Sequence, residues 1–147
     1  MKDIFLSPHF TLAELTHTIH TDIDNAPSPQ DIQRLQYLAV TLLEPLRAKF
    51  GPLEISSGFR TKPLNERLKG QPDSAHLYGC AADFVPRNAG VAEVVVWVMR
   101  DSGLPYDQVI DENKADRRWC HIGIAKPGRA APRREGWAFA NGAYRRL

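Results

Sequence analysis

The chain has 147 residues and a formal net charge of +2, with 43% hydrophobic and 24% charged residues. This length suits one domain that buries a core without disulfide bonds, and the composition is ordinary for a globular protein. No stretch approaches the roughly 18 uninterrupted apolar residues of a membrane-spanning helix, so we expect no membrane partner.

The small net charge conceals an uneven distribution. Residues 1–112 carry ten Lys and Arg against fifteen Asp and Glu, whereas residues 113–147 carry nine against two. A basic segment of this kind could attract an anionic polymer, although a solvated surface is the simpler interpretation. No nucleic-acid-binding motif accompanies it, so we expect no nucleic-acid partner.

The N-terminus and the cysteines bear on the compartment. Residues 1–15 carry acidic and polar side chains early and do not resemble a secretory signal, so cytoplasmic synthesis is expected. Cys80 and Cys120 are too few for a disulfide framework, and we expect buried, reduced thiols.

Helix signals dominate the first third of the chain. Thr11 followed by Glu14 is a capping-box pattern that predicts a short helix, and Ser28-Pro29 predicts the start of a second one. Pro45 should kink this second helix. Its expected buried stripe consists of Ile32, Leu35, Leu38, Leu42, Leu43 and Leu46.

Short strands and helices alternate after residue 52. Strands are expected at residues 53–57, 81–85, 108–111, 119–124 and 137–140, and helices at residues 61–69 and 91–101. A charged loop is expected at residues 112–118. The order lacks a regular βαβ rhythm and therefore indicates an α+β domain with a small, mostly antiparallel sheet and flanking helices, spanning residues 1–147. The basic segment 125–147 is either part of this domain or appended to it.

Two histidines and an aspartate are the strongest candidates for a metal site. His76 lies in a loop, and Asp83 follows seven residues later inside an apolar strand. A buried carboxylate is costly unless it is paired or binds a metal. His121 lies in a second apolar strand. Two imidazoles and one carboxylate with an open fourth position are what a catalytic zinc ion requires, although three separate core residues remain an alternative on spacing alone.

Three segments together resemble the zinc peptidases of the M15 family: SSGFR at 56–60, SAHLYGCAAD at 74–83 and WCH at 119–121. The family includes D-alanyl-D-alanine carboxypeptidases and phage L-alanyl-D-glutamate endopeptidases. The similarity runs from about residue 10 to residue 124 and is greatest to the short, single-domain branch of the family. It implies the fold of the D-Ala-D-Ala carboxypeptidases and the Hedgehog N-terminal domain.

The resemblance also implies roles for individual residues. His76, Asp83 and His121 would bind one zinc ion. Arg60 would bind a substrate carboxylate, because a guanidinium group matches a carboxylate in bidentate fashion, and Ser74 could add a hydroxyl donor. Trp119 shares the predicted face of His121 and could line the substrate site, with a core role as the alternative.

The general base is less clear from the sequence. Many family members have a carboxylate three residues before the last histidine, where this chain has Arg118. The single-domain branch has a similar Ile-x-Glu at the end of the preceding strand, which favours Glu112 here. Asp111 and Asp116 remain alternatives.

The expected function is zinc-dependent hydrolysis of an amide bond in the stem peptides of bacterial peptidoglycan, by a carboxypeptidase or an endopeptidase. We expect a monomer that acts at the cell wall after release, as a phage or prophage lysis enzyme would. A non-catalytic wall-binding or virion structural module that keeps the fold is the alternative, supported by Arg118. A further alternative is an anionic-polymer binder that uses the basic segment.

Overall fold

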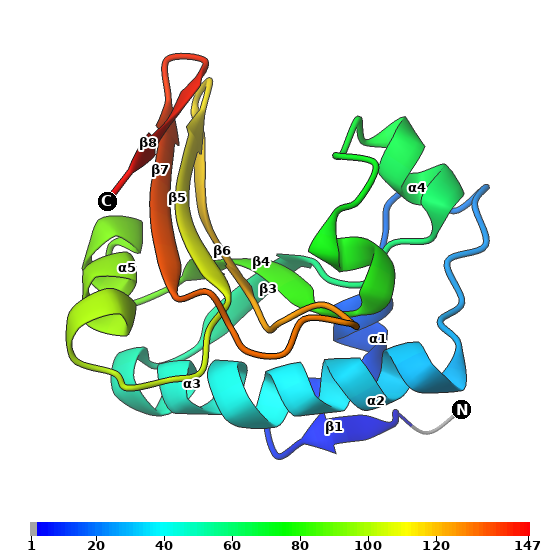
Figure 1. Ribbon diagram of the computed structural model, residues 1–147. Helices are drawn as coiled ribbons and strands as arrows, with labels where there is room; N and C mark the ends of the chain where they lie inside the picture. Colours follow the sequence, from blue (N-terminus) through cyan, green and yellow to red (C-terminus); the bar gives the residue numbers. More distant parts are fainter. Residues whose placement is uncertain (1–2) are drawn as a thin grey trace.

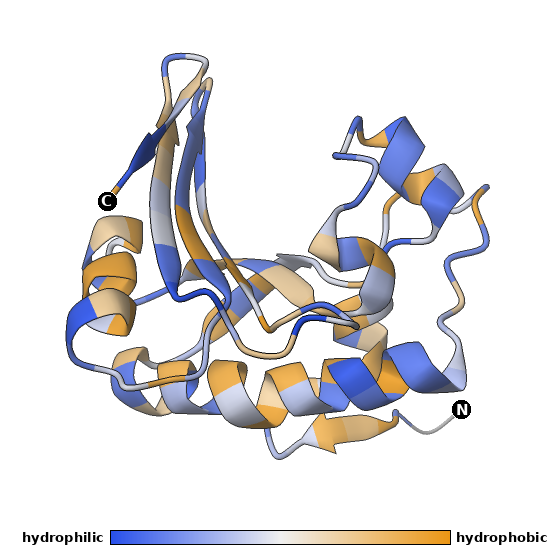
Figure 2. Ribbon diagram, in the orientation of Figure 1, coloured by the Kyte–Doolittle hydropathy of each residue, from blue (hydrophilic) through white to orange (hydrophobic). Residues whose placement is uncertain are grey.

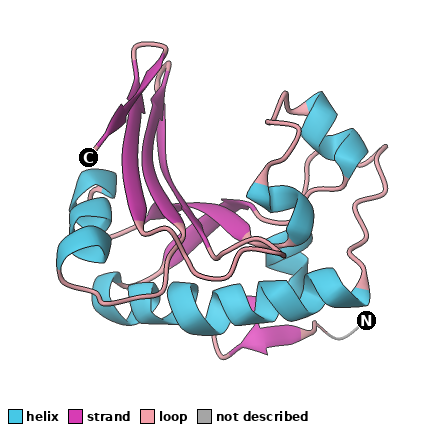
Figure 3. Cartoon of the chain, viewed as in Figure 1, coloured by secondary structure: helices cyan, strands magenta, loops and turns pink. Residues whose placement is uncertain are grey.

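The computed structural model describes residues 3–147. Its main element is a six-stranded sheet (Figures 1 and 3). The strand order is β3-β4-β6-β5-β7-β8, and every neighbouring pair is antiparallel except β5 with β7, which is parallel. The predicted α+β class with a mostly antiparallel sheet is therefore confirmed. The strands are β3 (Leu53–Ser57), β4 (Ala81–Pro86), β5 (Gln108–Lys114), β6 (Arg117–Gly123), β7 (Glu135–Ala140) and β8 (Ala143–Arg146).

Helices and a small hairpin surround this sheet. The remaining elements are β1 (Phe5–Ser7), β2 (Phe10–Thr11), α1 (Leu12–Thr16), α2 (Pro29–Leu38), the π-helical η1 (Ala39–Leu43), α3 (Glu44–Phe50), α4 (Lys62–Arg67), the 3₁₀ turn η2 (Ala75–Tyr78) and α5 (Val91–Arg100). In the described residues 3–147, no helix combines the length and the apolar character needed to cross a membrane.

Capping residues set the helix starts near the N-terminus. Thr11 and Glu14 form the predicted capping box of α1, and Ser28 and Asp31 form another at the start of α2. α2, η1 and α3 continue as one long helical stretch (Figure 1). The irregularity expected at Pro45 is the wide π turn just before it, because proline has no N–H to donate and its ring crowds the preceding turn.

One face of the sheet packs into the core. Phe84, Cys120 and Ile122 are fully buried on this face, where the largely hydrophobic α5 packs against the sheet (Figure 2). Gly136 lets α5 approach closely, because a Cβ atom there would lie 2.2 Å from the Met99 sulfur. Strand residues alternate between faces, so Asp83 and His121, each next to a core residue, point to the opposite face. We call that opposite face the site face.

The strand register arranges the site face in two rows. Asp83 on β4 pairs with His121 on β6, which pairs with Ile110 on β5. The second row joins Trp119, Glu112, Phe139 and Tyr144 across β6, β5, β7 and β8. Side chains in one row are neighbours, so this register determines which groups can act together.

The C-terminal half differs from the prediction in two places. Residues 112–118, expected as a charged loop, are mostly strand, because β5 and β6 form a continuous hairpin that pairs out to Lys114 and Arg117. β8 was not predicted, although Asn141-Gly142, with φ values of 53° and 79°, is a typical two-residue hairpin turn. Glu112 therefore lies on a strand, with a defined direction for its side chain.

The basic segment 125–147 is built into the sheet through β7 and β8. Its charges are partly used inside the protein: Arg133 donates to the buried carboxylate of Asp107 at 2.8 Å, and Arg129 lies 3.7 Å from it. Arg146 lies over the Trp137 ring at 5.3 Å. Since these arginines have internal partners, the positive charge available to an external polymer is smaller than the sequence indicates.

Candidate metal centre

His76 is held in a fixed orientation by the turn that carries it. The Ser74 hydroxyl caps η2 by accepting the His76 backbone N–H at 3.2 Å. The His76 ring is buried, and its Nδ1 donates to the Gly58 carbonyl oxygen at 2.6 Å. A carbonyl oxygen can only accept, so Nδ1 carries the proton and Nε2 presents its lone pair.

Gly79 allows this turn to close against α2. Its φ is +71°, and a Cβ atom there would lie 2.7 Å from the Asp31 carbonyl oxygen. An alanine would therefore suffer both a strained backbone and a collision with another segment's backbone.

We expect Gly79→Ala to lower the free energy of unfolding by roughly 2–4 kcal/mol, from left-handed strain plus overpacking. Gly142→Ala is the matched control, because Gly142 has a φ of +79° but no atom within 4 Å of an added Cβ. The control should cost only about 1 kcal/mol, the strain alone. Urea denaturation of both variants checks this, and equal losses would refute the close approach at Gly79.

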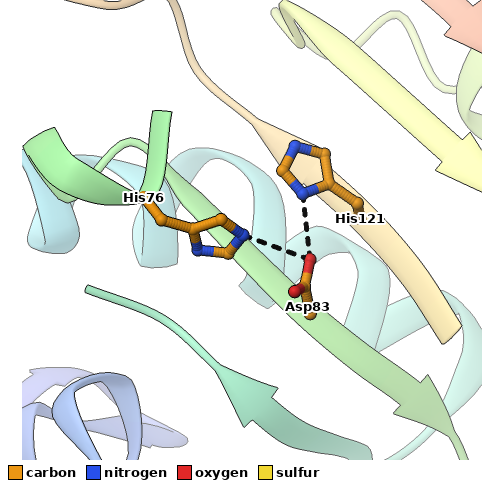
Figure 4. Close-up of side chains that lie close together, drawn as sticks. All are labelled: His76, Asp83 and His121. Carbon is orange, nitrogen blue, oxygen red and sulfur yellow. Dashed lines mark hydrogen bonds and ion pairs between the residues drawn. The ribbon is translucent and has the colours of Figure 1, made fainter. Parts of the chain in front are cut away.

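The three predicted ligands converge on one point (Figure 4). Asp83 Oδ1 lies 2.9 Å from His121 Nδ1 and 3.3 Å from His76 Nε2. One ligand atom from each residue lies within 4.8 Å of the other two. The pairing of β4 with β6 places Asp83 beside His121, and the turn η2 places His76 next to them.

The charges at this point fit a bound cation. Burial lowers the pKa of His76, so the ring is neutral near pH 7. Burial opposes ionisation of Asp83, but the hydrogen bond from His121 Nδ1 to Asp83 Oδ1 favours the ionised form, and the pKa of Asp83 lies well below its usual range. The Nε2 lone pair of His76 thus faces an ionised carboxylate oxygen, an arrangement that a cation between them would stabilise. Two imidazole nitrogens and one carboxylate oxygen suit zinc with an open fourth position.

Arg60 lies beside the three ligands. Its Nη2 is 3.4 Å from Asp83 Oδ2, its Nε donates to Ser57 Oγ at 3.1 Å, and its Nη1 donates to Asn65 Oδ1 at 3.3 Å. These contacts use three of the five guanidinium N–H bonds, so two remain for another acceptor. The SSGFR turn therefore presents an oriented cation next to the candidate metal site.

Glu112 shares the site face with His121. It is half-buried, and its cross-strand neighbour Trp119 lies two residues from His121 on the same face of β6. Burial raises the pKa of Glu112; the Asp83 charge adds to this, while His121 and a hydrogen bond from Tyr144 oppose it. A carboxylate with a raised pKa on the same face as a candidate metal site is suited to a proton-transfer role.

The other two candidate bases lie elsewhere. Asp111 points to the opposite face of β5, where Arg118 donates to both of its oxygens at 2.9 and 2.6 Å. Asp116 is exposed in the hairpin turn beyond Arg117, which itself lies about 13 Å along β6 from His121 at a strand rise of about 3.3 Å per residue. Neither residue joins the group around Asp83.

Two further sequence candidates have defined surroundings. Ser74 caps η2 through its oxygen, which positions His76 and leaves the hydroxyl proton able to donate. Trp119 is half-exposed on the site face, with the Arg117 guanidinium 5.9 Å from its ring centre. Cys120 is fully buried on the core face, opposite to His121, so its thiol does not join the converging ligand group.

Sequence reasoning missed two residues near the site. Asn65 is buried on α4 and accepts from Arg60, and Tyr144 on β8 donates to Glu112 Oε1 at 3.4 Å. The Asn141-Gly142 turn signal could have indicated a C-terminal hairpin with Phe139 and Tyr144 on one face. Nothing local indicated that Asn65 would reach Arg60.

A comparison of the sequence with protein-family models identifies the family of this chain. The family model for Peptidase M15 matches residues 8–122, which include Arg60, Ser74 and all three residues of the candidate metal site. A search of curated proteins found no match. The match covers well over half of the 147 residues, so the chain belongs to the peptidase M15 family and is a peptidase.

Proposed function

We propose that this peptidase uses one zinc ion to hydrolyse an amide bond in the stem peptides of bacterial peptidoglycan. The observation that carries the proposal is the convergence of His76, Asp83 and His121 on the site face, where one ligand atom from each lies within 4.8 Å of the other two. Membership of a zinc-dependent peptidase family supports the choice of metal.

The three residues would hold the metal through two imidazole nitrogens and one carboxylate oxygen. The Gly58 carbonyl accepts from His76 Nδ1 and so leaves Nε2 as the nitrogen available to a metal. This hydrogen bond orients the ring before a metal binds, which lowers the entropy lost on binding. When bound, zinc would supply the Lewis acidity that activates water near neutral pH and polarises a carbonyl.

Glu112 is the proposed general base. Its carboxylate oxygen accepts a proton from the attacking water and delivers it to the nitrogen of the leaving amine. The half-buried position beside Trp119 and the raised pKa support this role. Arg118, at the position where many family members have a carboxylate, is paired with Asp111 on the other face, so its presence does not disturb the site face.

Arg60 is proposed to bind a free carboxylate of the substrate with its two remaining N–H groups. Stem peptides offer two such groups: the terminal carboxylate of D-alanine and the α-carboxylate of D-glutamate. Binding the first would make the protein a carboxypeptidase, and binding the second would make it an endopeptidase. The substrate carboxylate would thereby set which amide bond lies at the metal.

Incubation of purified muropeptides with the zinc-loaded protein, followed by chromatography and mass spectrometry, tests the proposal. Release of D-alanine identifies a carboxypeptidase, and cleavage between L-alanine and D-glutamate identifies an endopeptidase. The absence of any new product with zinc bound would favour the alternative of a non-catalytic wall-binding module, for which Arg118 is the supporting observation.

Arg60→Lys should raise KM for a stem peptide by roughly 10- to 100-fold, because it replaces a charge-assisted, forked pair of hydrogen bonds by a point charge. Zinc content, measured by elemental analysis, should be unchanged. The exposed Arg87→Lys is the control, since its side chain forms a long, exposed ion pair with Glu54 at 3.9 Å. A peptide whose carboxylate is converted to a carboxamide should be cleaved equally by wild type and Arg60→Lys. A variant that loses the same factor on both peptides would contradict carboxylate binding by Arg60.

A further inference from the structure

Tyr144 contacts the candidate base from the last strand of the protein. Its hydroxyl donates to Glu112 Oε1 at 3.4 Å, across a separation of 32 residues. The family match ends at residue 122, so β8 lies outside the matched segment. This contact therefore belongs to the chain's own C-terminal hairpin, β7–β8.

Two strand pairings bring the phenol to this position. β7 pairs in parallel with β5 and sets Phe139 beside Glu112. β8 folds back at Asn141-Gly142 and sets Tyr144 beside Phe139. In Figure 1 this hairpin, drawn in red, stands next to β5. The register thus places the phenol in the same row as the carboxylate, one strand beyond it.

The Tyr144 side chain is largely exposed, and one aromatic neighbour contacts its ring. The rings of Phe139 and Tyr144 have centres 4.7 Å apart and planes inclined at 58°. Such a tilted aromatic contact restricts the ring while leaving the hydroxyl at its edge. Burial, together with the Glu112 charge, raises the pKa of Tyr144 to about 12, so the hydroxyl keeps its proton and remains a donor.

We infer that Tyr144 is a positioning residue whose hydroxyl orients the Glu112 carboxylate for proton transfer, so that the β7–β8 hairpin completes the catalytic site. This inference rests on the proposed role of Glu112 as the base. A carboxylate held by a donor on one oxygen presents its other oxygen in a defined direction, which is what a base needs to meet a particular water.

Tyr144→Phe tests the inference, because it removes the hydroxyl and keeps the ring that packs on Phe139. On a stem peptide we expect kcat to fall roughly three- to tenfold, the effect of one hydrogen bond to a charged group in a partly exposed setting. KM, zinc content and thermal stability should stay at wild-type values. Tyr37→Phe, on the exposed side of α2, is the matched control and should leave kcat unchanged.

A double-mutant cycle separates positioning from a general structural effect. In a Glu112→Asp background the shorter carboxylate is withdrawn from the phenol, so adding Tyr144→Phe should cause no further loss of kcat. Equal losses in both backgrounds would overturn the inference, as would a Tyr144→Phe enzyme as active as Tyr37→Phe. Those results would leave the proposed function intact if Glu112→Gln alone strongly lowered kcat. A wild-type protein that cleaves no stem peptide would overturn both proposals.

Discussion

His121→Ala is expected to abolish zinc binding and peptide hydrolysis together. The substitution removes one of three converging donors and leaves only His76 and Asp83. Removing a group that only orients a metal ligand lowers metal affinity or activity by about 10- to 100-fold. Removing a ligand itself should therefore lower both zinc affinity and activity by more than roughly 100-fold. Elemental analysis and muropeptide digestion measure the two effects on the same preparation.

Thermal unfolding gives an independent measure of zinc binding. At a zinc concentration of about 100 times the Kd, the wild type should gain about 2.7 kcal/mol, which raises Tm by roughly 5–10 °C in a chain of this size. His121→Ala should show almost no zinc-dependent rise. The control is His17→Ala, an exposed histidine outside the converging ligand group, which should respond like the wild type. Stoichiometric zinc retained by His121→Ala would remove this residue from the ligand set.

Glu112→Gln should lower kcat by roughly 10²- to 10⁴-fold, the usual contribution of a positioned general base. Zinc content and KM should change little, because Glu112 is not in the converging ligand group and glutamine has a similar size. Steady-state kinetics and metal analysis together distinguish a base from a ligand. Asp116→Asn is the matched control, since this carboxylate is exposed in the hairpin turn. A large loss in Asp116→Asn, with normal kcat in Glu112→Gln, would show that Glu112 is not the base.

The pH profile should carry the signature of the same residue. Burial raises the pKa of Glu112 above the ordinary 4.5, and the base must be deprotonated to act. Activity should therefore be full above this raised pKa and fall as the pH drops through it, so that kcat/KM has an acid limb above pH 4.5. The limb should disappear from the residual activity of Glu112→Gln. An unchanged limb in that variant would assign it to another group.

Local signals were sufficient for much of the N-terminal half. Thr11 and Ser28 cap α1 and α2 through contacts three residues away, so short sequence patterns predicted both starts correctly. The leucine stripe of the long helical stretch depends only on helical spacing, and Leu35, Leu38, Leu42, Leu43 and Leu46 are all fully buried.

The extent of the C-terminal strands was harder to predict. The charged residues of the β5–β6 hairpin resemble a loop by composition, because strand tips that project from the core need no hydrophobic alternation. β8 has four exposed residues and lacked the apolar pattern that usually indicates a strand. Both the β5–β6 hairpin tip and β8 are held by backbone hydrogen bonds to a neighbouring strand, and amino-acid composition does not predict such pairing.

The sequence by itself determined the chemical types in the candidate site: two imidazoles and a carboxylate in apolar surroundings, and an arginine after a glycine turn. Only the tertiary structure decided which groups meet. Asp111 and Glu112 are adjacent and chemically alike, yet the pairing of Ile110 with His121 turns Glu112 to the site face and Asp111 to Arg118. Tyr144 reaches Glu112 only through two successive strand pairings. Alternation along a strand is local, but the face that meets the metal ligands depends on register between distant segments.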